Sequence, residues 1–356
     1  MLTSLALLPF STAAQGDELD RGRLTISPGR EFRADSYVHK ELTPDVPLAP
    51  RSKDWVRELR RQVERYYGVA AVNIDRYSPP IFLVGAGQPT TRILAARSWD
   101  PGWSFPPLQA QFDEVPLPHD FVPSPGTDRE AIVYQPSTGR YWELWVAEKT
   151  GALTRDSDGG LREEWQAAWG GRIDRISENP GYFVTDRDGG KFGTAATGLP
   201  LLAGLMTIEE QLNGAINHPV HIALVETRRG AWAFPAQRSD GQVDRQDSIP
   251  EGTTFRLPYE VDIDALRLNP YCAMIARAVQ KYGMIVRDRA GGVVFYAENP
   301  IGIRGPHPYY AAGGILNCPD GKFSWQCAAD TNNRIKDFPF ERLVALEADI
   351  SVDGQR

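Results

Sequence analysis

The sequence predicts a mainly β protein, an antiparallel β-sandwich with two or three helices at its periphery. The chain of 356 residues contains 33 glycines and 28 prolines, which favour many turns and short strands over helical bundles. From Val69 onward, short apolar runs such as VAAVNI, IFLVGA and EAIVYQ are separated by these residues. A parallel α/β fold requires regular alternation of strands and helices, and the absence of that alternation favours the sandwich.

Composition and charge narrow the classes of function. Hydrophobic residues make up 42% of the chain, enough for a sizeable core in one large domain or two smaller ones. The net charge of −7, the pI near 5.4 and the lack of a basic stripe exclude nucleic acid as a partner, because phosphate binding requires a basic surface. No apolar stretch reaches the roughly 18–20 residues that cross a bilayer, so we expect no membrane span. Composition does not indicate the oligomeric state.

The first residues of the chain indicate export. The stretch MLTSLALLPFSTAAQG has a short apolar run followed by Thr12, Ala13 and Ala14, small residues of the kind found at signal-peptide cleavage sites. No Lys or Arg precedes the run, so a plain flexible terminus is the alternative. We expect a signal peptide over residues 1–14 and a secreted or extracytoplasmic protein.

The three cysteines of the chain also bear on whether the protein is exported. Cys318 and Cys327 flank the turn-rich loop CPDGKFSWQC, which predicts a local disulfide in an exported protein; two reduced thiols in a cytoplasmic protein are the alternative. Cys272 falls within a helical pattern and is expected to be a buried thiol. Because no CxxC spacing is present, the cysteines do not indicate a zinc site.

An arm and a helix come first along the chain, over residues 15–68. Residues 15–50 are polar and contain several prolines, which predicts an extended arm. The stretch SKDWVRELRRQVERYYG then has helical periodicity, with Ser52 as its cap and Gly68 as its stop. Residues 69–356 are expected to form the sandwich domain, with a helix and a hairpin as C-terminal extensions. The apolar residues at helical spacing are Trp55, Leu59, Val63 and Tyr67.

A hairpin is predicted by the stretch QPSTGRYWELWVAEK. Residues 136–139 have turn chemistry, and the segments on both sides have β-propensity. A loop of this length pairs Tyr134 with Tyr141 and Ile132 with Glu143. Period-2 alternation then assigns Trp142, Leu144 and Val146 to a core face, and Tyr141, Glu143 and Trp145 to the opposite face.

The face of Tyr141, Glu143 and Trp145 is a candidate saccharide-binding surface. Flat aromatic rings stack on the apolar faces of sugar rings, while carboxylates hydrogen-bond sugar hydroxyls. Glu143 is the first candidate for a general acid, because partial burial between two rings would raise its pKa. A solvent-facing glutamate with no catalytic role is the alternative.

A further strand is predicted at EEWQAAWGGRID. Asp174 is the candidate for the second carboxyl group that glycosidic hydrolysis commonly needs; an ion pair with Arg172 or Arg175 is the alternative. Trp165 and Trp169 share one face of this strand and belong either to the core or to the substrate surface. We expect Trp169 and Arg172 to contact the substrate.

Two histidines lie in the stretch INHPVHIALVE. Pro219 and the β-branched residues predict a strand, in which His218 and His221 point to opposite faces and cannot share a metal. Each could act alone, His218 as an acid or base and His221 as a substrate contact; a structural role is the alternative. Acidic pieces such as DSDGG could hold calcium, but Asp-Gly is ordinary turn chemistry, so no cofactor is predicted.

A second helix is predicted at NPYCAMIARAVQKYG. Asn269 can cap it, Pro270 suits its first turn and Gly283 suits its end. Two β-rich runs follow in GMIVRDRAGGVVFYAEN, and residues 289–292 between them predict a hairpin. The apolar stripe of the helix, which we expect to pack on the sandwich, consists of Met274, Ile275, Ala278, Val279 and Tyr282.

Part of the chain resembles a group of exported bacterial proteins with concanavalin A-like or jelly-roll sandwiches. The resemblance covers roughly residues 110–300 and is carried by GLPLLAGLMTIEEQLNGAINHPVHIALVE, GAWAFPAQRSDG and IPEGTTFRLPYEVDIDALRLNPYCAMIARAVQKYGMIVRD. It implies a fold more than an activity. Laminarinase-type glucanases of similar architecture carry E-x-D-x-x-E on a strand, whereas YWELWVAEK offers only Glu143 and Glu148, on opposite faces. Their mechanism therefore does not transfer to this chain.

The function expected from the sequence is an exported glycoside hydrolase that cleaves a polysaccharide by carboxylate acid/base catalysis. GxSxG, HExxH, a Walker loop and a strand-led GxGxxG are missing from the sequence, which removes support for serine esterases, zincins, nucleotide hydrolases and dinucleotide enzymes. One alternative is a lyase that acts on a uronic acid polymer and uses His218, Tyr141 and Arg172. The other is a non-catalytic carbohydrate-binding or cell-surface module, for which the aromatic residues suffice.

Overall fold

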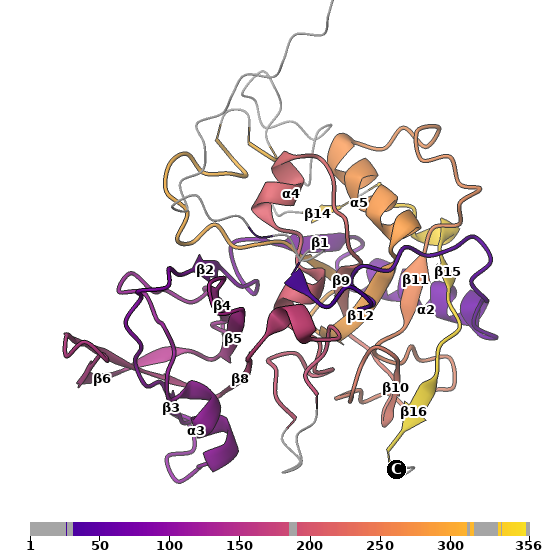
Figure 1. Cartoon of the computed structure of the whole chain (residues 1–356). Helices are drawn as coiled ribbons and strands as arrows, with labels where there is room; N and C mark the ends of the chain where they lie inside the picture. Colours follow the sequence, from indigo (N-terminus) through magenta and orange to yellow (C-terminus); the bar gives the residue numbers. More distant parts are fainter. Residues whose placement is uncertain are drawn as a thin grey trace, which may run out of the picture.

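The computed structural model describes residues 26, 31–184, 191–311, 314–316, 334–335 and 337–353. Within these residues the chain is mainly β, as predicted, with sixteen strands in four sheets and four α-helices (Figure 1). Three of the four sheets contain both parallel and antiparallel pairs. The predicted antiparallel β-sandwich is therefore not confirmed.

A seven-stranded sheet is the largest element of the fold. Its strand order is β14-β1-β13-β9-β12-β11-β15. β1 lies parallel to β13 and β9 lies parallel to β12, while the other neighbours are antiparallel. In chain order its strands are β1 (Ala70–Asn73), β9 (Val220–Leu224), β11 (Thr254–Arg256), β12 (Met284–Arg289), β13 (Val294–Tyr296), β14 (Arg334–Ile335) and β15 (Val344–Ala345).

The predicted hairpin around residues 289–292 is wrong. β12 and β13 do not pair with each other, because β9 lies between them and pairs with both. β9 is buried at all five positions, because a hydrophobic core lies on each face of the sheet. The connection at residues 290–293 consequently crosses the end of β9, where it lines the cavity described below.

The helix predicted after the N-terminal arm is α2 (Ser52–Arg65). Trp55 and Leu59 on its apolar stripe are buried. Ser52 is not the cap that the sequence predicts: the N-cap position is Arg51, and the Ser52 hydroxyl accepts a hydrogen bond from the backbone N–H of Ala345 (2.8 Å). The Ser52 hydroxyl therefore bonds a distant strand instead of capping the helix, which is the role that the local sequence predicts.

The second predicted helix is α5 (Pro270–Lys281), and its predicted ends are confirmed. The Asn269 side chain accepts a hydrogen bond from the backbone N–H of Cys272 (2.9 Å), which caps the helix. Gly283 has a φ of 94°, which suits the chain reversal after the helix. The predicted stripe is buried, with Ile275 fully inaccessible to solvent.

The shorter helices are α3 (Pro106–Phe112), α4 (Ile208–Leu212), and the 3₁₀ turns η1 (Ile176–Glu178), η2 (Leu201–Gly204) and η3 (Phe340–Arg342).

Two hydrophobic cores lie on the two faces of the seven-stranded sheet. Ile222 and Phe295 belong to one core, which α2 and α5 cover. Ala223, Val294 and Tyr296, at alternate positions of the same strands, belong to the other core. That second core is shared with a four-stranded sheet of order β2-β4-β5-β8, which lies on the side of the large sheet away from α2 and α5 (Figure 1).

The hairpin predicted around residues 136–139 is confirmed, including its register. β4 (Ala131–Gln135) and β5 (Arg140–Trp145) pair antiparallel, with Tyr134 opposite Tyr141 and Ile132 opposite Glu143. β5 also pairs with β8, so it is an inner strand of its sheet. The other strands outside the large sheet are β2 (Ile81–Leu83), β3 (Leu94–Ala95), β6 (Glu148–Arg155), β7 (Leu161–Ala167), β8 (Trp169–Ile173), β10 (Ala231–Ala233) and β16 (Ile350–Val352).

Several predictions fall on other parts of the chain. Cys272 is a buried free thiol, as expected. Cys318 and Cys327, for which a disulfide is predicted, lie outside the described residues, and so does the predicted signal peptide at residues 1–14. Among the described residues, no helix has the length and apolar character needed to span a membrane.

Candidate functional site

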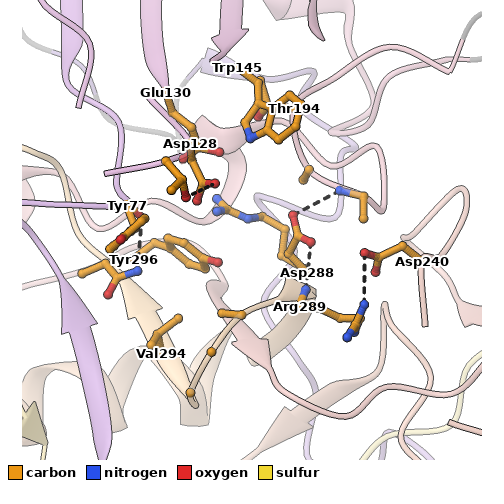
Figure 2. A pocket seen from close by; sticks show the side chains of 18 of the residues that line it. Tyr77, Asp128, Glu130, Trp145, Thr194, Asp240, Asp288, Arg289, Val294 and Tyr296 are labelled. Atoms are coloured by element: carbon orange, nitrogen blue, oxygen red, sulfur yellow. Dashed lines mark hydrogen bonds and ion pairs between the residues drawn. The ribbon is translucent and has the colours of Figure 1, made fainter. Parts of the chain in front are cut away.

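A cavity of about 900 Å³ lies where the large sheet meets the four-stranded sheet. β1, β12 and β13 contribute one part of its wall. Another part comes from Trp145 at the end of β5, Trp169 at the start of β8 and Glu130 just before β4; Figure 2 shows Trp145 and Glu130. Its lining combines aromatic and charged side chains, as expected for a site that binds a polar ligand with flat faces. The charged residues of the lining are Arg97, Asp128, Glu130, Arg238, Asp240, Arg287, Asp288 and Arg289.

Aromatic side chains come to this cavity from several segments. Trp145 and Trp169, two of the residues for which substrate contact is predicted, are directly opposite each other on β5 and β8, and both line the cavity. Phe105 stacks on the Trp169 ring with centroids 5.6 Å apart, which fixes the position of that ring. Tyr67 is 72% exposed and lies at the solvent side of the lining.

A β-bulge places Arg287 in the cavity. β12 pairs with β9 through Val286 and then Asp288, so Arg287 has no partner in the ladder. Its side chain is only 1% exposed, and the guanidinium carbon lies 3.7 Å from the centroid of the Tyr296 ring. Among the described residues, the Nε and Nη1 atoms of Arg287 have no hydrogen-bond partner. A buried cation with free donors is therefore part of the cavity wall.

Glu130 stands immediately before β4 and presents a buried carboxyl group to the cavity (Figure 2). Its main chain is fixed by Ser124, whose hydroxyl accepts from the Glu130 N–H (3.1 Å) and whose N–H donates to the Glu130 carbonyl (2.9 Å). Burial raises the pKa of Glu130 to about 8, although nearby Arg287 acts in the opposite direction. Glu130 is consequently protonated at neutral pH.

Asp288 is a second carboxyl group in the same cavity, in a different electrostatic setting. Its oxygens accept hydrogen bonds from the backbone N–H groups of Ala196 (3.1 Å) and Arg289 (2.8 Å). Burial raises its pKa to about 6, while Arg287 and these backbone donors limit the rise. Asp288 is therefore ionised at pH 7, when Glu130 is protonated. Such a separation of pKa values is typical of acid/base pairs in active sites.

The carboxyl groups of Asp240, Glu251 and Asp288 form the one group among the described residues with metal-ligand geometry, with oxygens within 4.8 Å of one another. Other contacts account for their proximity. Arg289 pairs with Asp240 (3.6 Å), and the Glu251 carboxyl accepts from Thr227 Oγ1 (3.3 Å) and from the Asp240 N–H (3.2 Å). Burial, together with repulsion from Asp288 and Asp240, raises the pKa of Glu251 well above its usual value.

Glu143, the first catalytic candidate from the sequence, does not face this cavity. It is fully buried, and its carboxylate accepts hydrogen bonds from Leu201 N–H (2.8 Å), Thr194 N–H (3.1 Å) and the Tyr141 hydroxyl (3.0 Å). Burial raises its pKa to about 7, against these hydrogen bonds. The prediction that Tyr141 and Glu143 line a groove is wrong, because η2 covers this face of the sheet and the opposite face is buried as well.

The other predicted catalytic residues also lie outside the cavity lining. Asp174 is 65% exposed at its side chain and pairs with Arg172 (2.8 Å), which is the alternative foreseen for it. His218 is buried, and its ring nitrogens form hydrogen bonds with the Pro219 carbonyl oxygen (2.7 Å) and the Glu210 carboxylate (3.1 Å). Its position is that of a structural residue.

His221, predicted to contact substrate, is fully buried within β9. Its ring packs against Gly204, where an added Cβ would lie 2.1 Å from the imidazole Cγ. Burial lowers the pKa of His221 well below its usual value, so the ring is neutral. The predicted substrate contacts His221, Arg172 and Tyr141 are thus absent from the cavity lining, whereas Trp145 and Trp169 are present.

Sequence reasoning missed Glu130, Arg287 and Asp288. A charged pair inside the apolar stretch MIVRDRAGG was the available indication, because charged residues in a buried strand are rare unless they are paired or functional. Glu130 gave a weaker indication as a lone carboxylate at the start of EAIVYQ. Neither pattern shows that the two segments meet, since they are far apart in the chain.

Comparisons with protein-family models, with curated proteins and with solved structures return no match. The resemblance to exported sandwich proteins therefore stays a prediction from the sequence, and the cavity itself carries the functional interpretation.

Proposed function

We propose that this protein is a carbohydrate-active enzyme, most simply a glycoside hydrolase, with the cavity as its active site and Glu130 as its general acid. The observation that carries this proposal is a carboxyl group kept protonated by burial in a cavity lined by aromatic rings. A general acid in glycosidic hydrolysis has these properties: a raised pKa and access to the leaving-group oxygen.

The lining fits a saccharide in shape and in chemistry. Trp145 and Trp169 offer ring surface for sugar faces, and the polar groups around them can bind hydroxyls. A cavity of about 900 Å³ lies within the range of pockets that hold small-molecule ligands. These features support a saccharide of a few units inside the cavity.

The two carboxyl groups have complementary roles in the proposed reaction. Glu130 donates its proton to the glycosidic oxygen as the bond to the leaving group breaks. Asp288, ionised at the same pH, acts at the anomeric carbon, either directly or by removing a proton from the attacking water. Arg287, stacked on Tyr296, favours the ionised form of Asp288 without contributing a proton of its own.

Turnover of a glycan panel by the parent protein and by Glu130→Gln tests this proposal. Glutamine retains the size of the side chain but cannot donate a carboxylic proton, so release of reducing ends should fall roughly 10²–10⁴-fold. Asp174→Asn is the matched control, because this acidic side chain is exposed and outside the cavity lining, and it should leave turnover unchanged.

Three results would contradict the proposal. Full activity in Glu130→Gln would remove the assigned acid. Unsaturated products, detected by their ultraviolet absorbance, would identify a lyase instead of a hydrolase. Glycan binding without cleavage would identify a binding module.

Export is part of the same hypothesis and is tested separately, by locating the protein in cell fractions.

A further inference from the structure

The guanidinium of Arg287 has donors that the fold does not use. Its side chain is 1% exposed, yet Nε and Nη1 have no hydrogen-bond partner among the described residues. Buried polar groups are nearly always hydrogen-bonded, and an unsatisfied donor on a charged group is especially costly. Because Arg287 lines the cavity, a ligand that enters the cavity can supply the missing acceptors.

Two neighbouring arginines of the cavity differ from Arg287 in their contacts or exposure. Arg238 donates to the carbonyl oxygens of Phe192 (2.9 Å), Gly193 (3.3 Å) and Ala195 (3.0 Å), so it holds the main chain together. Arg289 forms an ion pair with Asp240 at 3.6 Å; its Nε also lacks a hydrogen-bond partner among the described residues, but its side chain is 25% exposed. Of the three arginines, Arg287 alone is almost completely buried and has two donor atoms without a partner among the described residues.

The nearby carboxyl groups do not saturate Arg287 either. Asp288 accepts its hydrogen bonds from backbone N–H groups. Glu130, another acidic residue of the lining, has its pKa raised to about 8 by burial and is neutral below that pH. No carboxyl group of the described residues therefore bonds the Nε or Nη1 atom of Arg287, and both donors remain for the acceptor oxygens of a ligand.

We propose that Arg287 is an anion-binding residue of the cavity and holds the carboxylate or sulfate group of an acidic saccharide. The saccharide part of this proposal rests on the proposed function, whereas the anion site does not. Guanidinium groups suit both substituents because their several N–H donors bind planar or tetrahedral oxyanions through charge-assisted hydrogen bonds. The ring of Tyr296 beneath the guanidinium keeps it in place for this contact.

Nuclear magnetic resonance of the Arg287 Nε–H group provides the test. The signal is assigned as the one lost in Arg287→Lys, which retains the positive charge, and Arg287→Gln serves as a second variant. Sodium glucuronate, sodium sulfate and glucose are titrated into the full-length protein, with sodium chloride added to equalise ionic strength. Arg175→Gln is the control, since this arginine is 69% exposed at its side chain and lies outside the cavity lining.

The expected result is a saturable shift of the Arg287 signal with glucuronate or sulfate. The preferred anion should bind at least about tenfold more tightly than glucose. Arg287→Gln should abolish this preference and Arg175→Gln should retain it. Whichever anion binds more tightly identifies the substituent, and either result supports the site.

Two results separate this inference from the proposed function. A saturable response to neither anion, or equal binding of glucose and glucuronate, would overturn the anion site and leave a hydrolase of neutral glycans intact. An anion response that depends on Arg287, in a protein that cleaves no glycan, would keep the anion site and overturn the proposed function.

Discussion

Glu130 and Glu143 are two buried glutamates whose surroundings assign them different roles. Burial raises the pKa of both, to about 8 and about 7 respectively. Glu143 accepts two backbone N–H groups and a hydroxyl, and these bonds connect β5 to residues 194 and 201. Glu130 instead reaches the cavity. Glu143 is therefore a structural link, and Glu130 has access to a ligand.

Glu143→Gln should destabilise the fold and leave Glu130, the proposed general acid, in place. An amide has one acceptor oxygen where the carboxylate has two, so one of the donors at Leu201 and Thr194 loses its partner. The expected loss is about 1–3 kcal/mol in the free energy of unfolding. Urea denaturation followed by tryptophan fluorescence measures it.

The control for this variant is Glu163→Gln, at a side chain that is 58% exposed on β7. Exposed substitutions of this kind usually change stability by no more than about 0.5 kcal/mol. If Glu143→Gln had the stability of the parent but lost turnover roughly 10²–10⁴-fold, the catalytic role first assigned to Glu143 would be restored.

At the scale of elements, sequence patterns predicted what depends on neighbours along the chain. The hairpin register and the ends of α5 follow from a short loop and from capping residues, and both are confirmed. The pairing of β12 and β13 depends instead on β9, which comes about sixty residues earlier in the chain. A Gly-Gly turn predicts a hairpin locally, and tertiary pairing overrides it.

The candidate site was less predictable for the same reason. Trp145 and Trp169 could be identified because aromatic residues on adjacent strands are visible as a pattern. Glu130 and Asp288 come together only when the two sheets pack. The exposure of the Glu143 face was misjudged because alternation distinguishes the two faces of a strand but does not show whether a second layer covers one of them.

α5 is expected to be a structural support of the large sheet. Ile275 is completely buried in the core that this helix covers, so Ile275→Ala should lower the free energy of unfolding by about 2–5 kcal/mol through loss of contacts and the cavity left behind. Thermal unfolding followed by circular dichroism measures the change. An unchanged melting temperature together with altered saccharide binding would instead place this helix in the site.

At the scale of the whole molecule, buried acids should make stability fall as pH rises. Glu130 has a pKa of about 8 in the folded protein against 4.5 for the free side chain, so between these values only the unfolded chain has released the proton. The pKa of His218 is also raised, which adds a loss of the same sign as pH rises. The lowered pKa of His221 acts in the opposite direction, below about pH 6.5.

From about pH 6.5 to pH 8, Glu130 alone should lower the free energy of unfolding by about 1–2 kcal/mol. Urea denaturation at the two pH values measures the total change. In Glu130→Gln the decrease in the free energy of unfolding should be smaller than in the parent by this contribution of about 1–2 kcal/mol. An equal change in stability in the parent and in Glu130→Gln over this interval would show that Glu130 is ionised in the folded protein.

The pH dependence of kcat/KM for the parent and for Glu130→Gln, on a glycan that the parent cleaves, tests the assignment of the catalytic acid most directly. The pKa values of Asp288 and Glu130, about 6 and about 8, predict a bell-shaped profile with limbs near these values. The residual activity of Glu130→Gln should lack the alkaline limb. An alkaline limb that persists in the variant would contradict the assignment and place the acid elsewhere.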